Sequence, residues 1–120
     1  MTILFIDSSK KDARVALLSS ETVLAERAFL SQKTMANDIL VALDEMVAES
    51  GIAKEDIGRI AVVRGPGHFS AVRSGVAVAH SLALGWGVEL IGIPSSEVLD
   101  EYREAREGMP VDVVLPKYEV

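Results

Sequence analysis

Three short apolar runs constrain the fold of this chain more than any other feature. They are Ile3–Ile6, Ile60–Val63 and Leu90–Ile93, and none of them contains a charged residue. Unbroken apolar runs of this length are typical of strands buried on both faces, as in a parallel sheet covered by helices. We therefore expect three parallel strands at the centre of an α/β fold.

Two further strands are expected over Ala13–Leu18 and Val23–Leu30, joined by the short polar segment Ser19–Glu21. The connection between the first and second strands, Ser8–Asp12, is also short and polar. Because short loops join antiparallel neighbours, the first three strands should form a meander.

Helical spacing begins after Thr34, which is a suitable N-cap, and Gly51 is a suitable C-terminal stop. The apolar residues of this first helix are Met35, Ile39, Leu43, Met46 and Val47. A second helix is predicted over Ser70–Gly85.

The third helix is predicted to open at Ser95-Ser96-Glu97 and to end at Gly108 and Pro110. Beyond it, Val111–Leu115 predicts either an edge strand or an extended tail. The resulting order, β-β-β-α-β-α-β-α with a mixed five-stranded sheet, is that of the ribonuclease-H-like lobe of the actin-like ATPase superfamily. We assign residues 1–108 to this lobe and 109–120 to a C-terminal tail; the fold alone does not decide the function.

Composition excludes several functions. The 120 residues fit one domain, and they include no cysteine, so disulfides, thiol nucleophiles and cysteine metal sites are ruled out. The net charge of −6 and the 5% of aromatic residues argue against direct binding of nucleic acid. No apolar stretch approaches the ~20 residues of a membrane span, and the first residues do not resemble a signal peptide, so we expect a cytoplasmic protein without membrane contact.

Two loops should meet at the carboxyl ends of the strands, where open α/β sheets bind ligands. One is Asp7-Ser8-Ser9 and the other is Arg64-Gly65-Pro66-Gly67-His68-Phe69-Ser70. Glycine allows close approach of the backbone, Ser70 could cap the next helix, and Arg73 could add a cation. These residue types explain a plain strand-to-helix turn equally well. The candidate nucleotide or loop site comprises Asp7, Ser8, Gly65, Gly67, Ser70 and Arg73.

Asp7 also raises the hypothesis of a metal-dependent phosphotransferase or nuclease, with Asp38 as a second carboxylate. The alternative, in which Asp7 accepts hydrogen bonds from its own turn, is at least as well supported. A zinc site is disfavoured, because neither His68 nor His80 has a second histidine at helical spacing. No catalytic or metal-ligating residue is therefore assigned.

The second predicted helix is apolar around almost its whole circumference, with small residues at Gly75, Ala77, Ala79 and Ala83. A helix of this kind should be buried on two sides. One side covers the sheet, and the other packs against the first helix or against a second protein.

The motifs resemble those of the TsaB (YeaZ) family. Ile6-Asp7-Ser8-Ser9 is similar to its opening Ile-Asp-Thr-Ser, and the segment 64–75 is similar to its Arg-Gly-Pro-Gly-Ser-Phe-Thr-Gly signature with the following Arg and Gly. Leu82-Ala83-Leu84 and Gly92-Ile93-Pro94-Ser95-Ser96-Glu97 continue the likeness to about Ala105.

The resemblance implies a non-catalytic scaffold subunit that supports a TsaD-like enzyme in threonylcarbamoylation of the adenosine next to the anticodon of tRNA. It implies a TsaD-like partner, contact with a TsaE-like ATPase, self-association into a homodimer, and only indirect contact with tRNA. It implies no cofactor of the chain's own and leaves room for ATP or ADP at a surface shared with a partner. Carried over by position, the partner interface comprises Met35, Ile39, Leu43, Val72, Val76, Ala79 and Leu82.

The chain departs from the family pattern at His68, Ser70, Ala71 and Ser74, and Met35-Ala36-Asn37-Asp38 stands where the family often has His-Ser-Glu. The family's second lobe is missing, whereas Leu115-Pro116-Lys117-Tyr118 resembles its terminal Pro-x-Tyr-x-Arg, which favours a naturally shortened protein. A homodimer without a role in tRNA modification is therefore a further hypothesis.

Overall fold

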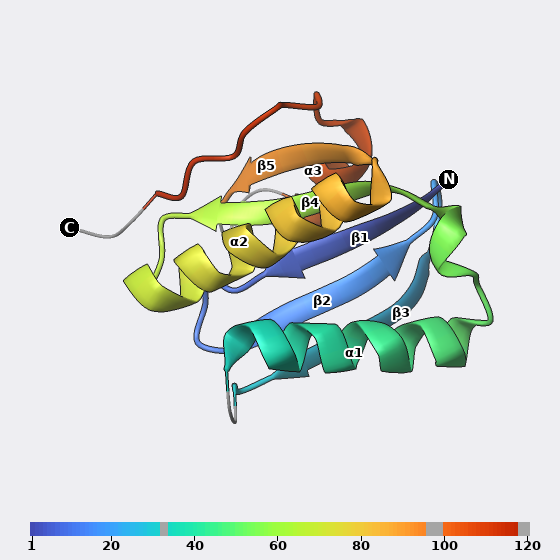
Figure 1. The fold of residues 1–120 in the computed structure, drawn as a ribbon, viewed down its shortest axis with the longest axis horizontal. Helices are drawn as coiled ribbons and strands as arrows, with labels where there is room; N and C mark the ends of the chain where they lie inside the picture. Colours follow the sequence, from blue (N-terminus) through green and yellow to red (C-terminus); the bar gives the residue numbers. More distant parts are fainter. Residues whose placement is uncertain (32–33, 96–99, 118–120) are drawn as a thin grey trace.

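The predicted sheet is present in a computed structural model, which describes residues 1–31, 34–95 and 100–117. The strand order is β3-β2-β1-β4-β5. The strands are β1 (Thr2–Asp7), β2 (Ala13–Leu18), β3 (Val23–Phe29), β4 (Ile57–Gly65) and β5 (Glu89–Pro94). The first three strands pair antiparallel, whereas β1, β4 and β5 run parallel (Figure 1). The expected meander and the expected parallel centre are both confirmed.

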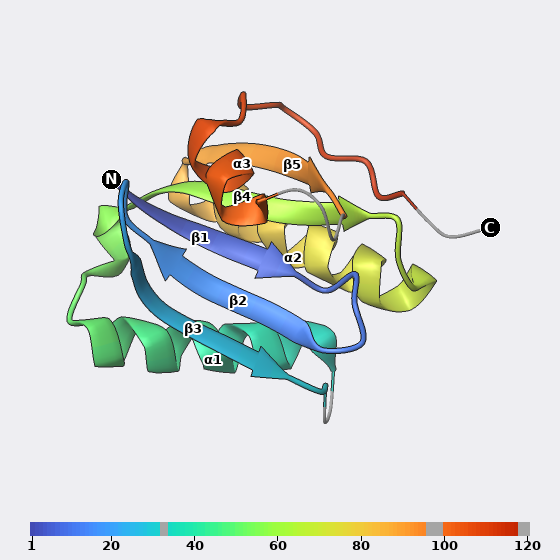
Figure 2. The ribbon, with the colours of Figure 1, turned by 180° about the vertical axis from the view of Figure 1, so that it is seen from behind.

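The helices cover the two faces of the sheet unequally. The long helices α1 (Met35–Ser50) and α2 (Phe69–Trp86) lie together on one face, and the short helix α3 (Glu101–Glu107) lies on the other (Figures 1 and 2). The predicted caps of α1 are confirmed: Thr34 accepts a hydrogen bond from the amide of Asn37, and Gly51 has a φ of 74°. A single 3-10 turn, η1 (Lys54–Asp56), leads into β4.

The sheet separates two layers of apolar side chains. The larger layer packs beneath α1 and α2, with Ile6, Val62 and Met46 fully buried. The smaller layer packs beneath α3, around Phe5 and Ile93. Every residue of β1 is buried, as expected for a strand covered on both faces.

The described part of α3 begins later than predicted. Glu101 is its first residue, and the side chain of Asp100 caps it by accepting a hydrogen bond from the amide of Arg103. Of the residues predicted to open this helix, Ser96 and Glu97 lie outside the described residues. Asp100 offers a carboxylate at the N-cap, which favours a helix start at this position.

Arg59 anchors the other end of α3 to the sheet. Its Nη1 donates to the carbonyl oxygens of Ala105, Arg106 and Gly108 at 3.0–3.3 Å, and its Nε donates to Glu89 at 2.9 Å. A cation at a helix C-terminus satisfies carbonyl groups that have no partner within the helix. This buried arginine therefore fixes α3 across β4.

The segment that follows α3 is an extended tail rather than a strand. The amide of Val111 donates to Leu90 at 2.8 Å, and the amide of Lys117 donates to Arg64 at 2.7 Å. Figures 1 and 2 show the tail running beside β5, where it covers the edge of the sheet. Tyr118 of the tail motif lies outside the described residues. Within the described ranges, no helix has the length and apolar character needed to cross a membrane.

Candidate functional site

The glycine-rich loop between β4 and α2 packs directly against the turn that follows β1. A Cβ atom added at Gly67 would lie 2.5 Å from the carbonyl oxygen of Ser9 and 2.8 Å from its Cα. Gly65 has a φ of 106°, a conformation that side-chain-bearing residues rarely adopt. The expected close approach of backbone to backbone is therefore present, and it occurs between two loops of this chain.

Asp7 is bound on both of its carboxylate oxygens. Oδ1 accepts from the amide of Ser9 at 2.9 Å and from its hydroxyl at 2.6 Å, and Oδ2 accepts from Lys10 Nζ at 3.1 Å. The residue is only 1% exposed. The interpretation that Asp7 is bonded within its own turn is thus confirmed.

The structure does not join Asp7 and Asp38 in a metal site. Asp38 lies in the first turn of α1, where it accepts a hydrogen bond from the hydroxyl of Ser31 at 2.7 Å. Among the described residues, no group of three or more His, Asp or Glu side chains is placed to hold a metal ion.

Ser8 fastens the same turn to α2. Its hydroxyl donates to the carbonyl oxygen of Ala71 at 2.7 Å, and it is completely buried. An added Cβ at Gly75 would overlap Ser8 Oγ and would lie 3.0 Å from Ser8 Cβ. The absence of a side chain at Gly75 therefore lets the helix sit close to the turn.

Ser70 and Arg73 lie apart from these buried contacts. The prediction that Ser70 caps α2 is wrong, because the N-cap residue is His68, whose side chain makes no capping hydrogen bond. Ser70 lies within the first turn and is exposed. Arg73 is also exposed, and its guanidinium lies 5.1 Å from the centre of the Phe69 ring. Of the predicted loop site, Asp7, Ser8, Gly65 and Gly67 therefore come together as a structural joint.

A charged cluster beside Asp7 was not predicted from the sequence. Glu101 Oε1 accepts from Lys10 Nζ and from Arg14 Nη2, each at 2.9 Å, and Glu101 is only 5% exposed. Burial lowers the pKa of Lys10, but hydrogen bonds to Glu101 and Asp7 and the charges of both outweigh it, so the net pKa is raised. These partners are about ninety residues apart in sequence, and no local pattern indicates such a contact.

Most of the predicted partner interface is buried within the chain itself. Five of the seven residues have at most 3% exposure and belong to the core beneath α1 and α2; they are Ile39, Leu43, Val72, Val76 and Ala79. Met35 and Leu82 are half-buried. The prediction that these five side chains face a partner is therefore wrong for this structure.

Other residues occupy the outward side of the two helices. Leu40 is 42% exposed on α1, and Ala77 and Ser81 are exposed on α2. They alternate with the buried residues at helical spacing. The outer surface of the α1–α2 layer, which we call the outer helical face, thus combines the exposed apolar residues Leu40 and Val41 of α1 with the small residues Ala77 and Ser81 of α2.

Together, the sheet order and the loop joint define an α/β lobe of the ribonuclease-H-like, actin-like ATPase class. The chain belongs to the TsaD family, whose model is described as tRNA N6-adenosine threonylcarbamoyltransferase and matches residues 24–115. The resemblance to TsaB that the loop motifs indicate is also confirmed by the relatives described next.

The chain is 33% identical over 99 residues to the tRNA threonylcarbamoyladenosine biosynthesis protein TsaB of Bacillus subtilis. The matched region covers 82% of this chain and 43% of that protein. It is 33% identical over 109 residues to the tRNA N6-adenosine threonylcarbamoyltransferase of Burkholderia multivorans, covering 78% of this chain and 32% of that enzyme. Among solved structures, YeaZ from Pseudomonas aeruginosa superposes with a TM-score of 0.73 at 27% identity, covering 88% of this chain and 49% of that one. The chain therefore spans less than half the length of each of these relatives.

Proposed function

We propose that this chain is a non-catalytic scaffold subunit that supports a TsaD-like enzyme in threonylcarbamoylation of the adenosine next to the anticodon of tRNA. The observation that carries the proposal is the state of Asp7. This carboxylate stands where a kinase or nuclease of this fold class would place a reactive or metal-binding group, yet both of its oxygens are bound by neighbours of the same turn. A role in assembly therefore fits the site better than a role in the chemical step.

The names of two relatives support a role in the synthesis of threonylcarbamoyladenosine in tRNA. The Bacillus subtilis relative is a threonylcarbamoyladenosine biosynthesis protein, and the Burkholderia multivorans relative is the transferase. With a net charge of −6, this chain would meet tRNA through a basic partner rather than directly.

The outer helical face is the proposed docking surface for the TsaD-like partner. Leu40 supplies an exposed apolar side chain, while Ala77 and Ser81 are small enough to let a partner helix approach closely. Neither Leu40 nor Ala77 is charged, so burying them costs little desolvation energy. The same face would serve a homodimer, and the two assemblies would then exclude each other.

The test is co-purification with the TsaD-like protein of the same organism, followed by measurement of modified adenosine in tRNA from a strain that lacks this chain. Ala77→Arg should abolish the complex, because it places a long charged side chain on the docking surface. Ala53→Arg is the matched control, since Ala53 is exposed just before η1 and its backbone amide donates to Asp56. A complex that tolerates Ala77→Arg, or unchanged tRNA modification in the deletion strain, would contradict the proposal.

A further inference from the structure

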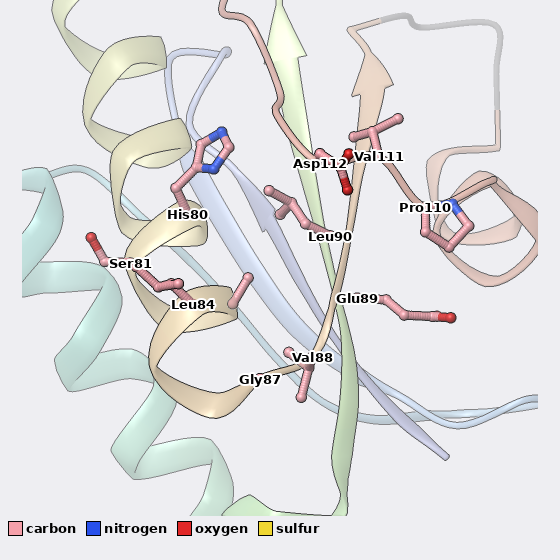
Figure 3. A pocket seen from close by; sticks show the side chains of 11 residues that line it. His80, Ser81, Leu84, Gly87, Val88, Glu89, Leu90, Pro110, Val111 and Asp112 are labelled. Carbon is pink, nitrogen blue, oxygen red and sulfur yellow. The ribbon is translucent and has the colours of Figure 1, made fainter.

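A groove lies between the C-terminal half of α2, the start of β5 and the tail. Its volume is about 800 Å³, which is within the range of ligand-binding clefts. Figure 3 shows α2 on one side, the tail with Val111 and Asp112 on the other, and Leu90 of β5 between them. The groove is thus bounded by three segments that meet only in the folded chain.

The groove offers an apolar surface to an occupant. Leu84 is 86% exposed and Val111 is 44% exposed, while Val88 is half-buried and Leu90 lies at the bottom with 5% exposure. Exposed aliphatic side chains that converge on a concave surface gain free energy when another apolar group covers them. The occupant should therefore carry aliphatic groups.

The charges of the groove all have one sign. Its lining contains Asp112 and Glu89 and neither lysine nor arginine, and Figure 3 shows the Glu89 side chain directed away from α2. Glu89 is paired with Arg59, whereas Asp112 is exposed and forms no ion pair within the described ranges. The C-terminal end of α2, including Gly87, also lines the groove, and the last turn of this helix contains no basic residue to offset its partial negative charge.

His80 holds the tail that forms one wall of the groove. Its Nε2 lies 3.0 Å from both the amide nitrogen and the carbonyl oxygen of Val114, and Val114 is the buried residue of the tail. The histidine therefore keeps the wall of the groove in place. A cationic group on the occupant of the groove would complement Asp112 and the C-terminal end of α2.

We propose that this groove binds a cationic amphipathic peptide segment of a partner protein, in which lysine or arginine is flanked by aliphatic residues. The aliphatic groups would pack on Leu84 and Val111, and the cation would pair with Asp112. Nucleic acid does not fit, because its phosphates would be repelled by the Asp112 carboxylate. The groove opens beside the tail and shares Ser81 with the outer helical face, and the proposal does not depend on the proposed function.

The test is titration of the full chain, labelled with ¹⁵N, with the peptide Ac-Leu-Lys-Leu-Leu-Lys-Leu-amide and with its analogue in which glutamate replaces lysine. Only the lysine peptide should produce saturable shifts of the Val88, Leu90 and Val111 amides. Raising sodium chloride from about 50 mM to about 300 mM should weaken this binding, because exposed charges are screened.

Asp112→Lys should weaken binding of the lysine peptide by about fivefold or more, as expected from losing an exposed ion pair and adding a repulsion. The matched control is Glu55→Lys, an exposed residue in η1 that makes no described contact, and it should change binding by less than about twofold. Shifts confined to other regions, equal binding of the glutamate peptide, or unchanged binding by Asp112→Lys would each overturn the proposal.

Discussion

Replacement of Gly67 by alanine tests whether the loop joint holds this lobe together. The new methyl group would lie 2.5 Å from the carbonyl oxygen of Ser9 and 2.8 Å from both its Cα and Cβ atoms. Contacts this short are not tolerated, and two of the three involve backbone atoms that cannot rotate away. Either the loop or the Ser9 turn must move.

Movement of Ser9 would be costly because the residue is bonded in three ways. Its amide and hydroxyl both donate to Asp7 Oδ1, and its hydroxyl lies 3.0 Å from Ser95 Oγ. Overpacking costs about 1–3 kcal/mol, and a weakened charged hydrogen bond adds about 1.5 kcal/mol or more. We therefore expect Gly67→Ala to lower the free energy of unfolding by about 3 kcal/mol.

The assay is urea unfolding followed by circular dichroism, supported by calorimetry, in which a loss of this size lowers the melting temperature by roughly 10 °C. Gly85→Ala is the control, because an added Cβ at Gly85 meets no atom within 4 Å. That substitution should leave stability unchanged or raise it by up to about 1 kcal/mol, since alanine favours the helix. If Gly67→Ala unfolds at the same urea concentration as the parent chain, the joint does not have the role assigned to it.

Three further outcomes are expected. Gly75→Ala should lower the free energy of unfolding by about 1–3 kcal/mol, because the new methyl group overlaps the Ser8 side chain. Adding Ser8→Gly to this variant should restore part of the lost stability, because the overlapping side chain is then absent; additive losses in a double-mutant cycle would contradict this contact. Arg59→Met should lower the free energy of unfolding in urea by about 2–4 kcal/mol, because three carbonyl groups and a carboxylate lose a charged donor. Replacement of the exposed Arg103 by methionine should lower it by less than about 0.5 kcal/mol, and equal effects of the two substitutions would be inconsistent with the anchoring of α3 by Arg59. Burial and a hydrogen bond to a glutamate raise the pKa of Tyr102 from 10.0 to about 12, so its stabilising contribution should be complete below pH 10 and fade as the pH rises towards 12. An absorbance titration should show this late step and Tyr102→Phe should remove it, whereas ionisation of both tyrosines of the chain near pH 10 would disprove the assignment.

The fold could be predicted from the sequence because its signals are local. Unbroken apolar runs mark the buried strands, and the polar Ser19–Glu21 marks the hairpin between β2 and β3. The caps of α1 at Thr34 and Gly51 depend on single residues and their immediate neighbours. Each of these features requires only the intrinsic preference of a short segment.

The functional surfaces could not be predicted in the same way. Helical spacing shows that Ile39 and Val76 share a face with other apolar residues, but it does not say whether the sheet or a partner covers that face. In the structure the sheet covers it, and the exposed positions such as Leu40 and Ala77 are offset by one residue along each helix. The contact of Lys10 with Glu101 depends on the packing of α3, for which residue spacing carries no information.

The prediction of a nucleotide site at this loop and the observed role of the loop as a joint have one physical origin. Glycine at Gly65 and Gly67 removes Cβ atoms, and the vacated space can be filled by a phosphate or by backbone. Here backbone fills it: Ser9 packs against Gly67, and Lys117 of the tail packs against Gly65. The carbonyl group of Gly65 also accepts from the amide of Ser95, so the loop binds the turn after β1, the end of β5 and the tail at once. A glycine-proline-glycine motif at the end of a strand therefore indicates close approach, and only the chemistry of what approaches can distinguish a ligand site from a structural joint.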